Sequence, residues 1–200
     1  MRLGFDFDNT LISYDLLFHR VALDKGLIHK DLLKQKKAVR DYMRDMGAED
    51  EWTRLQGEVY GGRILEAEPF IGMMPTIKVL AAKKIPMYIV SHKTKTPYLG
   101  EPWDLHSAAR GWLKKHGFFN SDGLAWSKGQ VFFELTMQEK IERIVSLGCT
   151  HYVDDLPEIL EMLPRHIVKI LFTPNQCIKI QDNWSYLSSW QDLPKILELE

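Results

Sequence analysis

Short apolar runs alternate with helical patterns along most of the chain. An apolar run of four to eight residues without regular polar alternation is typical of a strand buried on both faces of a sheet. Runs of this kind occupy residues 2–7, 86–91 (PMYIVS), 149–155 (CTHYVDD) and 166–173 (HIVKILFT). They predict four strands of a parallel sheet.

Segments with apolar residues at helical spacing separate these runs and predict the helices that cover the sheet. They lie at residues 75–85, 104–118, 136–148, 156–163 and 189–199. Residues 119–135 give no regular pattern, and we expect at most one short strand there, near Leu124. Strands that alternate with helices predict an α/β fold with a Rossmann-like parallel sheet and right-handed crossovers.

One polar, helix-rich stretch, residues 14–67, interrupts this alternation after the first strand. We expect one helix in 15–27, another in 30–47, and a less regular one in 49–68. The GEVYGG segment at 57–62 lacks the strand-turn-helix context of a phosphate-binding loop, so we interpret it as a flexible joint. The predicted division is an α/β core of 1–13 and 68–200 with a helical insert of 14–67.

The composition narrows the class of protein. The chain has 200 residues, of which 45% are apolar, and its 26 basic and 27 acidic residues give a net charge of −1. This apolar fraction supports a real core, and the balanced charge gives no general attraction to nucleic acid or anionic membranes. Two cysteines, Cys149 and Cys177, fit a reducing compartment without a disulfide framework. Because no signal peptide and no apolar stretch of about 18 residues is recognisable, we expect a cytoplasmic protein.

Two aspartates follow the first strand closely. In the FDFDNT segment at 5–10, Asp6 and Asp8 lie two positions apart, and alternation along a strand sends such residues to the same side. Two carboxylates within several ångströms repel each other unless a cation, a shared proton or a lysine offsets their charge. The pair therefore predicts a positively charged partner.

Two further strands also end in reactive residue types, namely Ser91 and the pair Asp154 and Asp155. Ligands of open α/β sheets bind beyond the carboxyl ends of the strands. If these strands are parallel neighbours, four carboxylates and one hydroxyl converge there, which is a set of hard oxygen ligands that suits Mg²⁺. The alternative is that each aspartate only caps the following helix, but two acidic pairs at two strand ends favour the metal site.

The same segments resemble the motifs of the haloacid dehalogenase (HAD) superfamily of phosphotransferases. FDFDNTL is similar to its first motif, MYIVS to the second and HYVDDL to the fourth, and a lysine before the fourth motif forms the third. The order matches, and the resemblance covers residues 1–13 and 75–173. It implies the HAD fold, with the insert in the position of the helical cap called type 1.

The resemblance also implies roles for the first motif. Asp6 would be the nucleophile that forms an aspartyl-phosphate. Asp8 would act as general acid and then as general base, and its backbone carbonyl would bind the metal. Thr10 would order the turn beside the bound phosphate. Because members that do not hydrolyse phosphate esters often lack the second acid, Asp8 favours a phosphatase.

The other motifs would hold the phosphoryl group and the metal. Ser91 would donate a hydrogen bond to a phosphoryl oxygen, and Asp154 and Asp155 would complete the Mg²⁺ shell, with Asp155 preferred as the direct ligand. Two lysines are candidates for the third motif, Lys140 and Lys128. We favour Lys140, because it starts the helix that leads into the strand bearing the acids.

The loop after Ser91 adds candidates for substrate binding. His92 and Lys93 follow this serine directly, and Lys95 lies close behind, so they could touch an anionic substrate. A helical cap of this size implies a small metabolite, with sugar phosphates and nucleotides as the leading classes.

The predicted function is therefore Mg²⁺-dependent hydrolysis of a phosphate monoester in a small soluble metabolite. One alternative is a HAD phosphotransferase or a dehalogenase-like hydrolase, although the latter chemistry needs neither Mg²⁺ nor the second acid. Another is a ligand-binding or regulatory module without catalysis. The expected partner is a small phosphorylated metabolite, with no nucleic acid and no membrane, and the sequence leaves the oligomeric state open.

Overall fold

A computed structural model describes residues 1–174 and 183–199, so Cys177 lies outside the described residues. By its internal contacts the chain divides into two compact units. We call the first the α/β unit; it comprises Met1–Ile12, Pro69–His92 and Leu124–Glu200. We call the second the helical unit; it comprises Ser13–Glu68 and Lys93–Gly123. The boundaries fall partly within a two-stranded sheet of β2 (Ile12–Ser13) and β3 (Glu68–Pro69).

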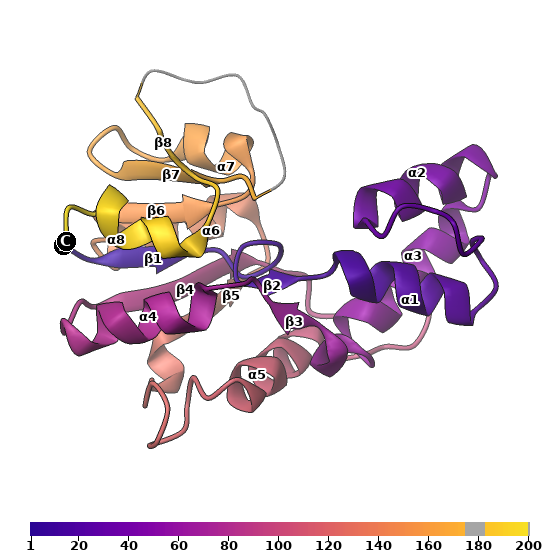
Figure 1. The fold of residues 1–200 in the computed structure, drawn as a ribbon, viewed down its shortest axis with the longest axis horizontal. Coiled ribbons are helices and arrows are strands. Elements are labelled where there is room, and N and C mark those ends of the chain that lie inside the picture. The colour runs from indigo at the N-terminus through magenta and orange to yellow at the C-terminus, as the bar shows by residue number, and fades with distance from the viewer. Residues whose placement is uncertain (175–182, 200) are drawn as a thin grey trace. The chain divides into compact units, whose positions relative to one another are not determined.

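The α/β unit contains a six-stranded sheet with the strand order β5-β4-β1-β6-β7-β8 (Figure 1). The strands are β1 (Leu3–Phe5), β4 (Met87–His92), β5 (Val131–Glu134), β6 (His151–Asp154), β7 (Val168–Phe172) and β8 (Ser185–Leu187). All the neighbouring strands pair in parallel. This architecture confirms the predicted α/β fold with a Rossmann-like parallel sheet.

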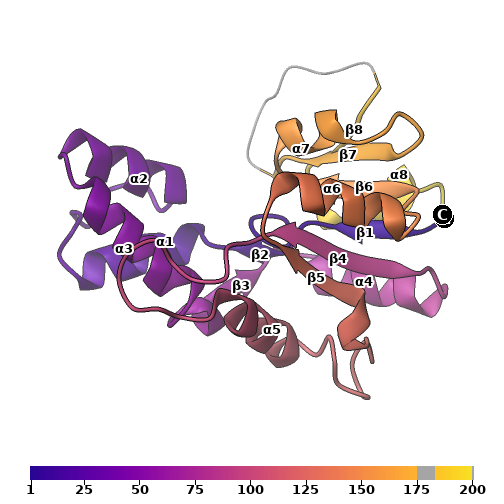
Figure 2. The same cartoon turned by 180° about the vertical axis from the view of Figure 1, so that it is seen from behind.

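Helices cover both faces of this sheet, as the views from the two sides show (Figures 1 and 2). One face carries α4 (Met73–Ala82) and α8 (Leu193–Ile196), and the other carries α6 (Met137–Ser146) and α7 (Pro157–Met162). Since each central strand is covered twice, both of its faces must be apolar. The continuous apolar runs of the sequence follow from this arrangement.

The helical unit holds α1 (Asp15–Asp24), α2 (Lys36–Asp45), α3 (Glu49–Tyr60) and α5 (Leu105–Lys115), with a short 3₁₀ helix at Ile64–Glu66. An aromatic cluster joins α1 to α3. The rings of Phe18 and Trp52 stack with centroids 5.0 Å apart, and those of Tyr14 and Tyr60 meet edge-on at 4.8 Å. The insert therefore has a core of its own.

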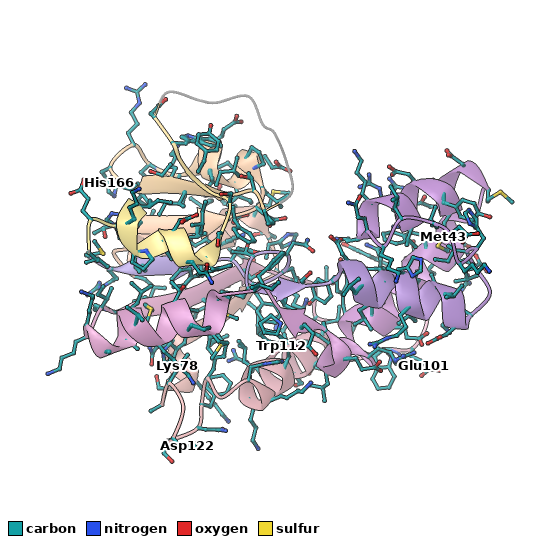
Figure 3. All side chains as sticks on the ribbon, in the orientation of Figure 1. Met43, Lys78, Glu101, Trp112, Asp122 and His166 are labelled. Carbon is teal, nitrogen blue, oxygen red and sulfur yellow. The ribbon has the colours of Figure 1, made fainter. Side chains whose placement is uncertain are left out.

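The helical unit contains the predicted insert, 14–67, together with a segment that the sequence-based division placed in the core, 93–123. Trp112 of α5 (Figure 3) explains this grouping, because its side chain is fully buried and its indole N–H donates to the carbonyl of Ala67 at 2.8 Å. The ammonium of Lys115 donates to the carbonyl of Leu65. These contacts join α5 to the end of the insert.

Two local predictions were wrong. The helix expected at 30–47 begins only at Lys36, where the carboxylate of Asp15 accepts a hydrogen bond from the first helical N–H at 2.9 Å. No strand forms near Leu124 in the described part of the chain; β5 lies seven residues further on. The short edge strand β8 was also missed. Edge strands of three or four residues carry too few apolar positions for a pattern to be read.

Two of the three glycines of the GEVYGG segment, Gly61 and Gly62, have a packing role. A Cβ added to Gly61 would lie 2.5 Å from the side chain of Trp103, and one added to Gly62 would lie 2.8 Å from its indole ring. Only glycine therefore lets Trp103 pack on this backbone.

None of the helices in the described part of the chain has the length and apolar character needed to span a bilayer.

Candidate functional site

Three predicted acids meet at the carboxyl edge of the sheet. Because β1 pairs with both β4 and β6, the carboxyl ends of these three strands lie next to one another. Asp6 directly follows β1, Asp154 ends β6, and Asp155 is the next residue. One carboxylate oxygen from each of the three lies within 4.8 Å of the others. We call these residues the acid cluster.

Lys140 of α6 reaches into the acid cluster. Its ammonium lies 2.6 Å from a carboxylate oxygen of Asp6 and 2.7 Å from one of Asp154, and the lysine is only 1% exposed. The helix starts with a capping box between Thr136 and Glu139, which fixes its first turn at this edge of the sheet. The other candidate, Lys128, lies exposed in a 3₁₀ helix at 128–130.

Burial dominates the electrostatics of the cluster. It raises the pKa of Asp6 to about 7, although the ammonium of Lys140 opposes this shift and the charges of Asp154 and Asp8 add to it. Burial would lower the pKa of Lys140, but the charges of Asp6 and Asp154 outweigh it and raise this pKa, so the lysine stays an ammonium ion. With the carboxyl groups ionised, the acid cluster and Lys140 retain an excess of two negative charges.

Hydrogen bonds orient the two acids of the fourth motif differently. One oxygen of Asp154 bonds Lys140, and the other accepts the N–H of Leu156 at 2.9 Å. The carboxylate of Asp155 accepts a hydrogen bond from the hydroxyl of Thr10 at 3.4 Å. Both oxygens of Asp154 therefore already have partners in the protein.

The turn after β1 places the rest of the first motif. Asn9 adopts a left-handed conformation with φ of 55°, and the N–H of Leu11 bonds the carbonyl of Phe7 at 3.0 Å. Asp8 lies half-buried in this turn and does not belong to the acid cluster, although its charge contributes to the raised pKa of Asp6. Thr10 is fully buried inside the turn.

Ser91 lies at the same edge of the sheet, one residue before the end of β4. It is 1% exposed, and its hydroxyl has no hydrogen-bond partner among the described residues. Leaving a buried hydroxyl without a partner costs about 1–3 kcal/mol. A ligand oxygen would remove this cost, so the hydroxyl fits a role in binding.

The two residues after Ser91 belong to different units, His92 to the α/β unit and Lys93 to the helical unit. His92 ends β4, and its Nε2 donates to the carbonyl of Leu135 at 3.1 Å. Lys93 begins the second segment of the helical unit, where it is 4% exposed and its ammonium lies 5.0 Å from the ring centroid of Tyr60.

The acid cluster fits a hard divalent cation. Oxygens bound to one Mg²⁺ lie about 3–4 Å apart, because each sits about 2.1 Å from the ion. The three carboxylate oxygens of the acid cluster lie within 4.8 Å of one another, which is near that spacing. Their excess negative charge supplies the attraction.

The helical unit contains a cavity of about 410 Å³ that the sequence did not predict. Trp103 lines it together with three basic residues, Lys25, Arg54 and Arg63, and two acidic ones, Glu58 and Glu101. Lys25 and Glu58 pair with each other at 2.7 Å. Charges of both signs therefore line this cavity.

The chain is similar in sequence to a known protein over almost its whole length. A protein of Oceanobacillus iheyensis named "Putative nucleotidase" is 22% identical over 199 residues, and the alignment covers 96% of each chain. No protein-family model matches the chain.

Solved structures give the fold. A HAD family hydrolase from Deinococcus radiodurans, solved with bound phosphate and sodium, aligns with a TM-score of 0.60 and 14% identity over 99% of this chain and 95% of that one. A HAD phosphatase from Thermococcus onnurineus aligns with a TM-score of 0.54 and 16% identity over 100% and 98%. An L-2-haloacid dehalogenase aligns with a TM-score of 0.54 and 10% identity over 98% of each chain. The resemblance inferred from the motifs is confirmed at the level of the HAD fold.

Proposed function

Given the HAD fold and the acid cluster, we propose that the protein is a Mg²⁺-dependent hydrolase of phosphate monoesters in small soluble metabolites. The observation that carries this proposal is the buried contact of Lys140 with Asp6 and Asp154 beside Asp155. Burying the carboxyl groups of Asp6 and Asp154 with an ammonium ion, beside the half-buried Asp155, costs free energy, and such clusters are typical of sites that bind ligands or carry out chemistry.

Asp6 is the proposed nucleophile. Its carboxylate attacks the phosphorus atom, the bond from phosphorus to the ester oxygen breaks, and Asp8 gives its proton to the leaving oxygen. Asp8 then takes a proton from a water molecule, which attacks the aspartyl-phosphate and releases inorganic phosphate and free Asp6. The contact with Lys140 supports this assignment, because it fixes the orientation of the attacking carboxylate.

The remaining site residues would bind the phosphoryl group. The hydroxyl of Ser91 donates to a phosphoryl oxygen, and the ammonium of Lys140 offsets the negative charge that gathers during transfer. Thr10 holds the turn through its bond to Asp155. We propose that His92 and Lys93, which follow Ser91 in the chain, contact the rest of the substrate.

Mg²⁺ is the proposed cofactor. Asp6 and Asp155 would hold it directly, with the backbone carbonyl of Asp8, while Asp154 completes the shell and orients Lys140. A bound Mg²⁺ would neutralise charge on the phosphoryl oxygens and favour the ionised form of Asp6.

The substrate class is the finer part of the proposal. The helical unit is inserted after the first motif, in the position of the HAD cap that selects small metabolites. Nucleotides and sugar phosphates are the proposed classes, and the name of the Oceanobacillus iheyensis relative supports nucleotides. The dehalogenase neighbour shares only the fold, and a dehalogenase requires neither Asp8 nor a metal.

The test is phosphate release from p-nitrophenyl phosphate, nucleoside monophosphates and sugar phosphates, with Mg²⁺ and with a chelator. We expect turnover with Mg²⁺ only, and its loss in Asp6→Asn but not in Asp122→Asn, a change at an exposed loop residue (Figure 3). Halide release from haloacids, with no hydrolysis of any phosphate ester, would show a dehalogenase instead. Cation binding without either reaction would show a binding module.

A further inference from the structure

Tyr152 lies on the same face of the sheet as the side chain of Asp154, one step further from the carboxyl edge. It precedes Asp154 by two residues in β6, and alternate residues of a strand share a face. Its side chain is completely buried in an apolar cluster that includes Val90 and Ile141. Its role was not predictable from the sequence, because a tyrosine in an apolar strand carries no signal of its own.

The ring of Tyr152 crosses the central strand at a glycine. Gly4 of β1 is the register partner of Tyr152, and a Cβ added there would lie 2.6 Å from a ring carbon. Side chains do not approach a Cβ so closely, so only glycine at position 4 leaves room for the ring.

Beyond β1, the hydroxyl of Tyr152 donates to the backbone carbonyl of Val90 in β4. β4 and β6 are not neighbours, since β1 lies between them. The side chain therefore links two strands across a third, at the residue just before Ser91. It fixes the backbone that carries the buried Ser91 hydroxyl.

The same ring lies beside the ammonium of Lys140. The ring centroid is 5.6 Å from the nitrogen that bonds Asp6 and Asp154. A cation at this distance is attracted by the ring face, and the attraction is strongest where water is excluded. An aliphatic residue of similar size would fill the space without attracting the charge.

We propose that Tyr152 is a positioning residue that fixes the side-chain positions of both Lys140 and Ser91. Its ring holds the ammonium between the two carboxylates, and its hydroxyl holds Val90 so that Ser91 faces the ligand. The catalytic consequence rests on the proposed phosphatase function, whereas the positioning of Lys140 is a property of the folded chain.

The first experiment measures hydrogen exchange at the Lys140 ammonium, which reports on its position and needs no catalytic turnover. In protein with ¹⁵N-labelled lysine, the ammonium protons of Lys140 should exchange slowly with water, because the side chain is buried and hydrogen-bonded. Tyr152→Leu should speed this exchange by about tenfold or more, because the ring attraction is lost, whereas Tyr152→Phe keeps the ring and should change it by less than about twofold. Leu163→Ala, at a buried residue of the same apolar cluster, controls for general loosening and should leave the exchange unchanged.

The second experiment measures kcat and the affinity for inorganic phosphate. Tyr152→Leu should lower kcat by about 30-fold, and Tyr152→Phe should restore most of it. Tyr152→Phe should instead weaken the binding of inorganic phosphate in the presence of Mg²⁺ by about five- to tenfold, since the bond to Val90 is lost. If Tyr152→Leu does not fold, Tyr152→Met replaces it, because methionine keeps the bulk without the ring.

Unchanged exchange and unchanged kcat in a folded Leu or Met variant overturn the proposal. So do equal changes in Leu163→Ala, because they would mean general loosening. Unchanged phosphate binding in Tyr152→Phe overturns the part that concerns the hydroxyl. A wild-type protein that hydrolyses no phosphate ester refutes the proposed function instead, and the exchange measurement still decides the role of Tyr152.

Discussion

Two ion pairs, one in the α/β unit and one in the helical unit, lie in opposite environments. In the α/β unit, Lys140 pairs with Asp6 and Asp154 at 2.6 and 2.7 Å, and none of the three side chains is more than 7% exposed. In the helical unit, Lys25 and Glu58 also pair at 2.7 Å, but their side chains are 45% and 30% exposed. The distances are nearly equal, and the energetics differ.

Solvent exposure sets this difference. An exposed ion pair contributes roughly 0–1 kcal/mol to stability, because water already solvates both charges. Removing a charge from water costs several kcal/mol, and the pairing must offset that cost. A buried charge cluster is therefore poor evidence for stability and good evidence for chemistry.

The largest effect is expected from Asp6→Asn. The amide keeps the shape of the side chain but cannot act as the nucleophile, so kcat should fall by about 10⁴-fold or more. Glu58→Gln makes the same chemical change in the exposed pair and should leave kcat unchanged. Steady-state kinetics on the best phosphate ester give both values, and a loss below tenfold for Asp6→Asn would contradict the nucleophile assignment.

Lys140→Met should cause the largest loss of stability. It leaves Asp6 and Asp154 buried without their counter-charge, which should lower the free energy of unfolding by about 3–5 kcal/mol. Lys25→Met removes the same functional group from the exposed pair and should cost less than about 1 kcal/mol. Urea unfolding of the two variants measures the difference. Similar losses of stability would mean that burial does not distinguish the two ion pairs.

Mg²⁺ should act on the acids of the α/β unit. A cation that binds only the folded state stabilises it by about 2.7 kcal/mol at 100 times its Kd, so it should raise the unfolding midpoint. Asp155→Asn should remove most of this shift, whereas Asp122→Asn, in the helical unit, should leave it intact. Thermal unfolding with Mg²⁺ and with a chelator tests this, and an equal shift in both variants would place the cation elsewhere.

The sequence alone predicted the features that depend on local pattern. The central strands could be predicted from the sequence, because helices cover both of their faces and the strands are therefore continuously apolar. Asp6, Ser91 and the pair at 154–155 were readable because parallel neighbours bring strand ends together. Those rules need no knowledge of side-chain positions.

The features that could not be predicted from the sequence depend on contacts between residues that lie far apart along the chain. The place of Tyr152 in the site follows from Gly4 and Val90, which lie on two other strands. Both candidate lysines precede the fourth motif, and only the fold shows which one reaches the acids. The segment 93–123 joins the helical unit through Trp112, whose partner lies 45 residues away.

The smallest effect comes from two helix caps, one in each unit. Thr136 accepts the N–H of Glu139 at the start of α6, and Asp104 accepts the N–H of Ser107 at the start of α5. Alanine at either position should cost about 1 kcal/mol, because each removes one capping bond. Only Thr136→Ala should also lower kcat, by a few fold, since α6 carries Lys140.

The pH dependence separates the two caps further. The backbone N–H of Ser107 lowers the pKa of Asp104, so its contribution is complete above the unfolded pKa of about 4 and is lost as the pH falls through the lower folded value. The hydroxyl of Thr136 does not titrate. The cost of Asp104→Ala should therefore shrink in acid while that of Thr136→Ala persists, as unfolding midpoints at pH 7 and in mild acid would show. Equal loss of kcat in the two variants would contradict the assignment of Lys140, because the cap of α5 has no part in the acid cluster.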